Sequence, residues 1–401
     1  MKDKKIFGLQ KNVFFTGLTS FFTDTSTKMI YSVMPLFLLS IGASKTSISL
    51  IEGIAESTAS LIKAFSGYWS DKIGKNKPFM ILGYGITALI TPLYALVRLP
   101  VQVLLLRFVE RTGKGLRAAP RDSLISASVL KEETGKNFGF HKAMDNSGAI
   151  LGPLLAYVIL SIASKNHGKP NLSDYRFLFY IAAIPALLGV ATIILFIKDA
   201  KTNEKKQSDN VSFRGFDKRF YIFLAIIFIF SLGNSTDTLL LLRAKDTGIN
   251  DATVALIYMM FNISSALFAV PIGIFSDKIH REKIIIAGFI LYALVYFGFA
   301  YAGNAILVAL LFLTYGLYSA ATDGVQKALV ADMIGNKNRG TGLGLYNAII
   351  GITLLPASIM GGKLWDMDHS HAMPFVFGAI MALISTLFLV IFYNKREVKE
   401  N

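Results

Sequence analysis

Residues 104–122, LLLRFVERTGKGLRAAPRD, decide the fold of this chain because they place a row of charges beside an apolar face. At about 100° per residue, the charged side chains share one arc of a helix and the other arc is apolar. In a soluble protein such a helix would be an ordinary basic surface. In a chain this apolar, the pattern predicts a membrane helix whose charges face a wet interior. The charged arc holds Arg107, Glu110, Arg111, Lys114, Arg117, Arg121 and Asp122, and the apolar arc holds Leu105, Leu106, Phe108, Val109, Leu116 and Ala119.

The composition supports a membrane protein. Of 401 residues, 53% are hydrophobic and only 17% are charged. Long apolar runs of about 20 residues are typical of transmembrane helices. We therefore predict an all-α membrane protein with twelve transmembrane helices. The predicted spans are residues 13–41, 47–69, 78–97, 101–119, 138–162, 177–197, 220–242, 253–275, 284–302, 305–328, 342–360 and 375–393.

The net charge of +15 fits the positive-inside rule better than nucleic-acid binding, because most Lys and Arg outside the spans fall in the expected cytoplasmic loops and tails. We expect a multi-pass protein of the cell inner membrane, with both termini cytoplasmic and the first apolar run retained as a helix rather than cleaved. The absence of cysteine excludes disulfides and thiol chemistry.

The chain contains two copies of one unit. SDKI at 70–73 recurs at 276–279, GLRAA at 115–119 aligns with GLYSA at 316–320, and residues 138–143 align with 343–348. The three matches keep the same order at spacings near 200, which indicates an internal repeat. We predict a six-helix bundle at 1–197, a cytoplasmic linker at 198–219 and a second six-helix bundle at 220–401, related by pseudo-two-fold symmetry about the membrane normal.

These features resemble the major facilitator superfamily over essentially the whole chain. The loop GYWSDKIGKNK at 67–77 resembles that family's signature between helices two and three, and its copy at 273–283 is degenerate. Arg107 and Glu110 match the fourth-helix signature, although Arg111 stands where the signature has glycine. The run at 110–124 resembles a prokaryotic branch of the family. The resemblance implies a fold of two bundles around a central cavity.

The fifth helix resembles an antiporter signature through Gly139, Gly148, Gly152 and Pro153, although its last two glycines are Ala156 and Tyr157 here. Small residues and proline permit close packing and a bend. The resemblance favours export by antiport over symport. We assign the gating of the conformational change to Gly67, Asp71, Lys72, Arg117, Asp122, Asp145, Gly148, Gly152, Pro153 and Asp277.

Ionisable groups at membrane depth cost roughly 2.5–3.5 kcal/mol each to insert, so each needs a partner or water. Candidates for a coupling proton are Asp24, Glu52, Glu56 and Glu110, with purely structural pairing as the rival interpretation. For Asp145, a salt bridge that closes a loop is favoured over transport chemistry. The predicted substrate contacts are Lys28, Arg107, Arg111, Lys114, Asn234, Asp237, Asn262, Tyr346 and Asn347. We expect charge-coupled steps in the N-terminal half and aromatic and hydrogen-bonding contacts in the C-terminal half.

The predicted function is secondary active transport of a small solute by alternating access, coupled to protons. The basic fourth helix favours an organic anion, either a carboxylate metabolite or a carboxylate siderophore. The alternatives are a proton-antiport efflux pump for lipophilic drug-like compounds, a lipid flippase, or a membrane receptor that transports nothing. We expect a monomer in the lipid bilayer whose partners are substrate and protons.

Several other classes find no support in the sequence. Residues 112–115, TGKG, lack the leading glycine and the following Ser or Thr of a phosphate-binding loop, and no strand precedes them. No spacing typical of hydrolases appears, so we predict neither an enzyme nor a cofactor. His369 and His371 could touch a metal ion, but two lone histidines are more typical of a solvated loop.

Overall fold

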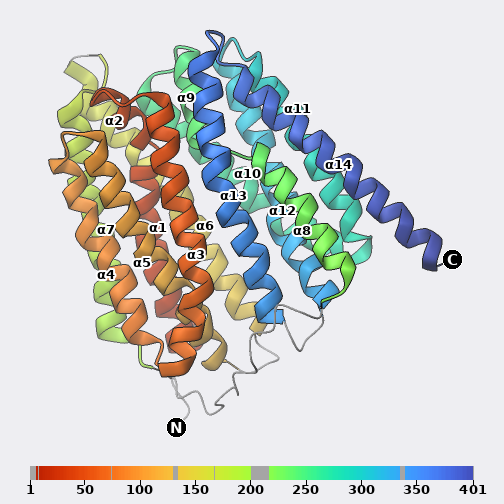
Figure 1. Ribbon diagram of the computed structural model, residues 1–401. Coiled ribbons are helices and arrows are strands. Elements are labelled where there is room, and N and C mark those ends of the chain that lie inside the picture. The colour runs from red at the N-terminus through yellow and green to blue at the C-terminus, as the bar shows by residue number, and fades with distance from the viewer. Residues whose placement is uncertain are drawn as a thin grey trace. The chain divides into compact units, whose positions relative to one another are not determined.

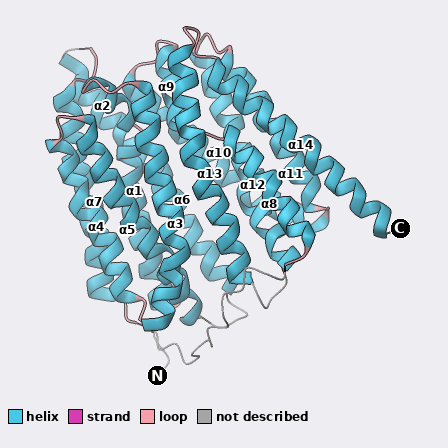
Figure 2. Ribbon diagram, viewed as in Figure 1, coloured by secondary structure: helices cyan, strands magenta, loops and turns pink. Residues whose placement is uncertain are grey.

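The computed structural model describes residues 6–7, 9–73, 75–129, 134–166, 168–199, 216–334 and 339–400. Within these ranges the chain is built almost entirely from long helices joined by short loops (Figure 2). Figure 1 labels the helices and colours them in chain order. The prediction of an all-α fold with twelve membrane helices is confirmed, although two of the predicted spans are each divided into two helices.

The first six spans begin and end within five residues of their predicted limits, except that α5 continues eight residues beyond the predicted end of the fourth span. They are α1 (Lys11–Tyr31) with α2 (Met34–Ser40), α3 (Lys45–Ile73), α4 (Lys77–Leu93), α5 (Pro100–Ala127), α6 (Thr134–Ala163) and α7 (Leu172–Phe196). The short 3-10 turns η1 (Tyr94–Leu96) and η3 (Ser164–Asn166) follow α4 and α6.

The last six spans follow the same pattern. They are α8 (Lys218–Gly233) with α9 (Thr238–Asp246), α10 (Asp251–Lys278), α11 (Arg281–Ala300), α12 (Ala305–Ile334), α13 (Arg339–Met367) and α14 (Met373–Glu400). Nine helical segments in the described residues are long and apolar enough to cross a membrane. The spans containing α1, α3 and α5 are not among them, because polar and charged side chains lower their mean hydropathy.

The two divided spans break at matching places. The first break falls just before Pro35, whose ring has no N–H to donate. The second falls at residues 234–237, Asn-Ser-Thr-Asp, side chains that compete with helical hydrogen bonds. After each short helix stands a glycine at φ 84°, Gly42 in one copy and Gly248 in the other, 206 residues apart. The repeat therefore extends to the breaks, which periodicity alone had predicted as continuous helix.

The charged arc of α5 faces the protein and its apolar arc faces outward. Arg107 and Glu110 are only 1% and 4% exposed, whereas Leu105 and Phe108 are 61% and 47% exposed. This is the reverse of a soluble helix and is what a membrane requires, since hydrocarbon solvates leucine and phenylalanine but not guanidinium groups. Arg107 and Glu110 therefore face the interior of the protein, while the prediction that this interior is wet remains a prediction.

The described chain divides into two compact units. One consists of Met1–Ala43, Thr58–Ser208 and Asn250–Met259, and the other of Ser44–Ser57, Asp209–Ile249 and Met260–Asn401. The start of α3 therefore packs with the second unit and the start of α10 with the first. The predicted division at the 198–219 linker remains a prediction.

Glycines set equivalent helix crossings within each unit. A Cβ on Gly115 of α5 would lie 2.8–2.9 Å from Ile62 and from the Ala59 carbonyl of α3. A Cβ on Gly316 of α12 would lie 2.6–2.7 Å from the Phe261 carbonyl and from Ser264 of α10. Because both glycines belong to the aligned GLRAA and GLYSA segments, the two copies share this packing as well as sequence.

Candidate functional site

The break after α1 gathers cations and aromatic rings within the first unit. Lys28 Nζ donates a hydrogen bond to the Tyr258 hydroxyl at 3.0 Å and lies 5.3 Å from the ring centres of Tyr31 and Tyr258. Arg107 of α5 lies over Tyr31 at 5.7 Å. A ring between two cations favours both through its negative faces. The sequence predicted Lys28 and Arg107 as substrate contacts but missed both tyrosines.

Next to this cluster, Glu110 is tied to two donors. Arg107 Nη1 and the Tyr94 hydroxyl each donate to Glu110 Oε2 at 2.9 Å. All three residues are buried. This geometry supports the structural-pair interpretation of Glu110, since a buried carboxylate held by a guanidinium and a phenol is already compensated. The sequence singled out Arg107 and Glu110 through their match to the fourth-helix signature and missed Tyr94.

The other cations of α5, Arg111, Lys114 and Arg117, follow Glu110 within about two turns of the helix. Arg111 is 5% exposed, whereas Lys114 is exposed. Arg117 is also buried, stacks over Tyr84 of α4 at 4.3 Å, and donates to Thr87 Oγ1 at 2.7 Å. Arg107, Arg111, Lys114 and Arg117 thus form a ladder of cations along α5, in which side chains of α4 anchor Arg117.

A second polar cluster joins α1, α4, α5 and α6. The hydroxyl of Ser20 lies 2.8 Å from His141 Nε2 and 3.2 Å from the Tyr84 hydroxyl. His141 Nε2 is in turn 3.7 Å from Asp145 Oδ1. The sequence had Asp145 as a gating residue and did not single out Ser20 or Tyr84, which lie on other helices.

Arg121 and Asp122 close this cluster on the α5 side. Arg121 contacts Asp122 at 3.0 Å and Asp145 Oδ2 at 4.0 Å. The structure therefore brings together two predicted gating residues, Asp122 and Asp145, through Arg121 of the charged arc.

The glycines of the fifth-span signature lie directly against α1. A Cβ on Gly148 would lie 2.5 Å from the Phe21 carbonyl, and one on Gly152 would lie 2.5 Å from the Thr25 carbonyl. Pro153 follows inside α6. By contrast, Gly139 has nothing within 4 Å of its Cβ position. Close approach of α1 and α6 thus depends on two of the three predicted glycines.

The other predicted proton-coupling acids belong to different units. Asp24 lies on α1 next to Gly148, in the first unit, and is half-buried. Glu52 and Glu56 belong to the part of α3 that packs in the second unit, where Glu52 is 1% exposed and Glu56 is half-buried.

In the second unit, the α8–α9 break carries the predicted contacts Asn234 and Asp237. The Tyr315 hydroxyl donates to Asp237 Oδ1 at 2.8 Å, and the Tyr292 hydroxyl donates to the Gly233 carbonyl at 3.0 Å. Tyr292 also stacks on Tyr296 at 4.0 Å. The sequence predicted aromatic contacts for this half in general and did not identify these tyrosines.

The three remaining predicted substrate contacts of the second unit lie apart from this tyrosine cluster in the chain. Asn262 is half-buried on α10. The Tyr346 hydroxyl is buried and donates to Gln326 Oε1 at 2.6 Å, and Asn347 Nδ2 donates to the Leu343 carbonyl at 2.7 Å. The polar groups of Tyr346 and Asn347 are therefore engaged within the protein.

Of the predicted gating residues in the two loop signatures, only Asp277 of the second copy has a described side chain. The side chains of Gly67, Asp71 and Lys72 lie outside the described residues. In the second copy, Asp277 pairs with Arg281 at 3.0 Å, and Arg281 reaches Asp332 at 2.8 Å. These three residues line a cavity of about 430 Å³ near the start of α8 and the end of α12.

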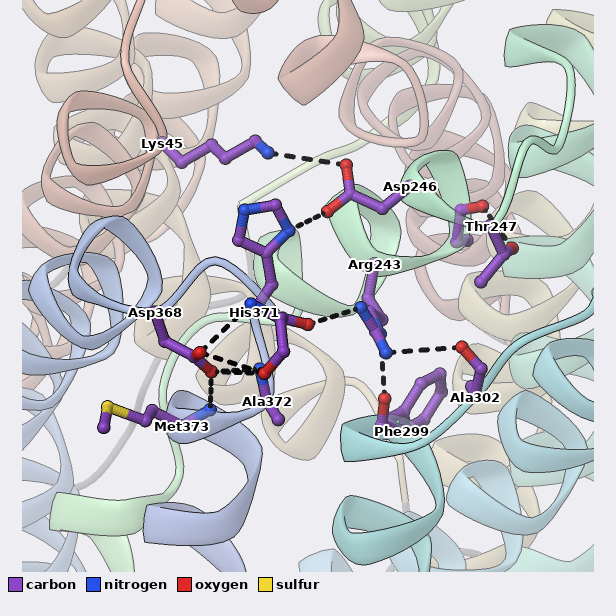
Figure 3. A network of polar contacts seen from close by, with 12 residues as sticks. Lys45, Arg243, Asp246, Thr247, Phe299, Ala302, Asp368, His371, Ala372 and Met373 are labelled. Atoms are coloured by element: carbon purple, nitrogen blue, oxygen red, sulfur yellow. Dashed lines mark hydrogen bonds and ion pairs between the residues drawn. The ribbon is translucent and has the colours of Figure 1, made fainter.

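His371 belongs to a network at the ends of α9 and α13 (Figure 3). Its Nδ1 lies 2.6 Å from Asp246, which also contacts Lys45 at 3.4 Å. The imidazole stacks on Trp365 at 4.9 Å. Arg243 donates to the carbonyls of Phe299 and Ala300. His371 is therefore paired rather than simply solvated, and the described residues hold no group of three or more potential metal ligands.

Known proteins resemble the chain over its whole length. The family model described as Major Facilitator Superfamily matches residues 16–243 and 222–401. A protein of Methanocaldococcus jannaschii named as an MFS-type transporter is 36% identical over 391 residues, 95% of each chain. The quinolone resistance protein NorA of Staphylococcus aureus is 24% identical over 199 residues, 50% of this chain and 46% of that one.

Among solved structures, a POT family transporter in complex with 5-aminolevulinic acid superposes with a TM-score of 0.81. It covers 98% of both chains at 12% identity. An identity this low supports the fold and nothing finer.

Proposed function

The chain belongs to the Major Facilitator Superfamily, and from that premise we propose that it is a proton-coupled secondary transporter of a small organic anion. Transport by alternating access would open the substrate site alternately to either side of the membrane. Substrate or proton must favour one state through contacts made better in that state.

The observation that carries the anion assignment is the ladder of cations on α5. Arg107, Arg111 and Arg117 are each less than 7% exposed, and Lys114 on the same face is exposed. From position 107 to 117 this face carries four cations and one carboxylate, Glu110, which pairs with Arg107, and an excess of positive charge favours an anionic ligand. Guanidinium groups bind carboxylates in a bidentate fork, which suits a di- or tricarboxylate.

The second candidate is efflux of lipophilic drug-like compounds. It is favoured by the partial similarity to the quinolone resistance protein NorA and by the tyrosine cluster of the second unit. Large aromatic walls accommodate varied apolar ligands. Antiport with export agrees with the close α1–α6 packing at Gly148 and Gly152, which resembles the antiporter signature.

Thermal unfolding of the purified protein in detergent tests the two candidates. Succinate and citrate should raise the midpoint, because a ligand that binds only the folded state stabilises it. Ethidium and tetraphenylphosphonium should not. Arg111→Gln should weaken the apparent carboxylate affinity by about tenfold or more, equivalent to about 1.4 kcal/mol.

Lys169→Gln provides the matched control, since Lys169 is exposed in the loop between α6 and α7. It removes the same charge far along the chain from α5 and should leave the carboxylate response unchanged. Stabilisation by the two organic cations alone would reject the anion assignment and favour efflux.

A further inference from the structure

We propose that His141 and Asp145 of α6 together bind the coupling proton. This inference rests on the proposed proton coupling and moves its site away from Glu110, the acid of the fourth-helix signature. Asp145 enters as a proton-binding group rather than as part of a loop-closing salt bridge.

The first argument is that the half-buried side chain of Asp145, 17% exposed, has one carboxylate oxygen without compensation. Its Oδ1 atom is buried and has no hydrogen-bond donor among the described residues. The guanidinium of Arg121 lies 3.0 Å from the carboxylate of Asp122 but 4.0 Å from that of Asp145. A buried carboxylate oxygen without a donor is costly, and the cost is removed when the site takes up a proton.

The second argument is that His141 is placed to supply that proton. Its Nε2 lies 3.7 Å from the undonated Oδ1, and the imidazole is 4% exposed. A small side-chain rotation would convert this separation into a charge-assisted hydrogen bond. In the neutral state the same nitrogen is held by the Ser20 hydroxyl at 2.8 Å. One proton therefore exchanges a serine contact for a carboxylate contact.

The third argument concerns the route to the neighbouring cations. The Ser20 hydroxyl lies 3.2 Å from the Tyr84 hydroxyl, and the Tyr84 ring lies under Arg117. A change at His141 thus reaches the basic face of α5 through two hydroxyl groups. This is a physical link between proton binding and the proposed anion site.

The charged groups around the pair come from three helices. They are Asp24 of α1, Arg117, Arg121 and Asp122 of α5, and the exposed Lys142 of α6 itself, with the phenol of Tyr84 on α4. Asp122 already occupies Arg121 at close range. The other basic groups of the cluster therefore have two carboxylates, Asp24 and Asp145, to compensate. An added proton would neutralise part of this negative charge.

The internal repeat supplies a natural control. His141 aligns with Tyr346, and Asp145 falls at the position of Ile350. In that copy Tyr346 bonds to Gln326 and its helix forms without a titratable pair. The helix packing therefore does not require an imidazole and a carboxylate at these positions, and their presence in one copy points to function.

Infrared difference spectra test proton binding without substrate. The full chain in lipid nanodiscs is switched between about pH 8 and about pH 5, the range in which histidine is a switch. The wild type minus His141→Gln double difference should contain imidazole bands and a carboxyl change. Asp145→Asn should remove that carboxyl change, while Lys142→Gln and Asp332→Asn keep all of these bands. A double difference without imidazole bands would overturn the inference.

Transport by proteoliposomes gives a second, separate readout, with succinate and citrate as probes. His141→Gln and Asp145→Asn should lose the stimulation of uptake by an imposed pH gradient by about tenfold, the effect of about 1.4 kcal/mol. Asp145→Glu should recover part of it. Wild-type uptake that ignores the gradient would reject proton coupling itself. Coupled wild type with an equally coupled His141→Gln would reject only the assignment to this pair.

Discussion

The two copies of the repeat pack equivalent helices with different side chains, charged in the first copy and aromatic in the second. In the first copy, Arg117 of α5 stacks over Tyr84 of α4 at 4.3 Å. In the second, the position of Arg117 is held by Tyr318 of α12, whose ring lies 4.9 Å from that of Tyr292 of α11. One copy therefore buries a cation where the other buries only rings.

The same contrast runs along the whole ladder of α5. Its charged residues from Arg107 to Arg117 align with apolar or aromatic ones in α12, although both helices cross their neighbours at an equivalent glycine. Because equivalent helices pack with either charged or apolar side chains, the fold does not require the charges of the first copy. The aligned pairs are Arg107 with Val308, Glu110 with Leu311, Arg111 with Phe312 and Lys114 with Tyr315.

The largest effect should come from unbalancing the buried pair. Glu110→Leu leaves Arg107 buried without its carboxylate, and loss of one partner of a buried pair costs about 3–5 kcal/mol. Replacing both residues by those of the second copy, Arg107→Val with Glu110→Leu, should be much less damaging, because no uncompensated charge remains. Thermal and SDS-induced unfolding in detergent would measure both variants.

A double variant as unstable as Glu110→Leu would contradict the claim that the two solutions are structurally interchangeable. Arg98→Val provides a control for the loss of a cation, since Arg98 is exposed in the loop before α5. Its unfolding midpoint should stay close to that of the wild type.

The next effect tests the close packing found in the first copy. Gly152→Ala would place a Cβ 2.5 Å from the Thr25 carbonyl, a backbone atom that cannot rotate away. Overpacking of this kind costs about 1–3 kcal/mol, measured as a lower unfolding midpoint. Gly139→Ala, with open space at its Cβ, should not lower the midpoint. Equal behaviour of the two variants would show that α1 tolerates displacement from α6.

A smaller effect is expected in the aromatic copy. Tyr315→Phe removes the hydrogen bond to Asp237 and keeps the ring, and Asp237 is half-buried at the α8–α9 break. The net loss should be about 0.5–1.5 kcal/mol, the usual value for one hydrogen bond. Tyr301→Phe, at a position 74% exposed, is the control and should be neutral. An unchanged midpoint for Tyr315→Phe would mean that packing alone holds this cluster.

The sequence predicted contacts that depend on local spacing. Arg107 and Glu110 share a helix face because i and i+3 are neighbours on any α-helix. The glycines of α6 were predicted from their resemblance to the antiporter signature. The α8–α9 break was missed although Asn234 and Asp237 are residue types that favour turns, because the apolar run on either side suggested one helix.

Contacts between distant parts of the chain were not predictable from one sequence. Ser20 and His141 are 121 positions apart, and their hydrogen bond depends on how closely α1 and α6 approach. Tyr94 reaches Glu110 only because the chain turns as a 3-10 helix after α4. Such partners follow from tertiary packing, which no periodicity encodes.

The smallest predicted effect concerns the residues that precede α7 and α14, which are the last helices of the first and second copies. Asn171 caps α7 with an amide oxygen, whereas Asp368 holds the loop before α14 with a carboxylate. Hydrogen bonds from the Ser370 hydroxyl and from the Met373, Ser370 and Ala372 amides keep the pKa of Asp368 below its usual value. A depressed pKa in the folded state adds stability above the unfolded value of about 3.9, and this stability is lost as the pH falls through the folded value. Asp368→Asn should therefore lower the unfolding midpoint slightly at neutral pH and progressively less at acidic pH. A difference that stays constant on acidification would mean that the carboxylate charge does not contribute. In that case Asp368 would act before α14 as Asn171 does before α7, as a hydrogen-bond acceptor whose charge adds no stability.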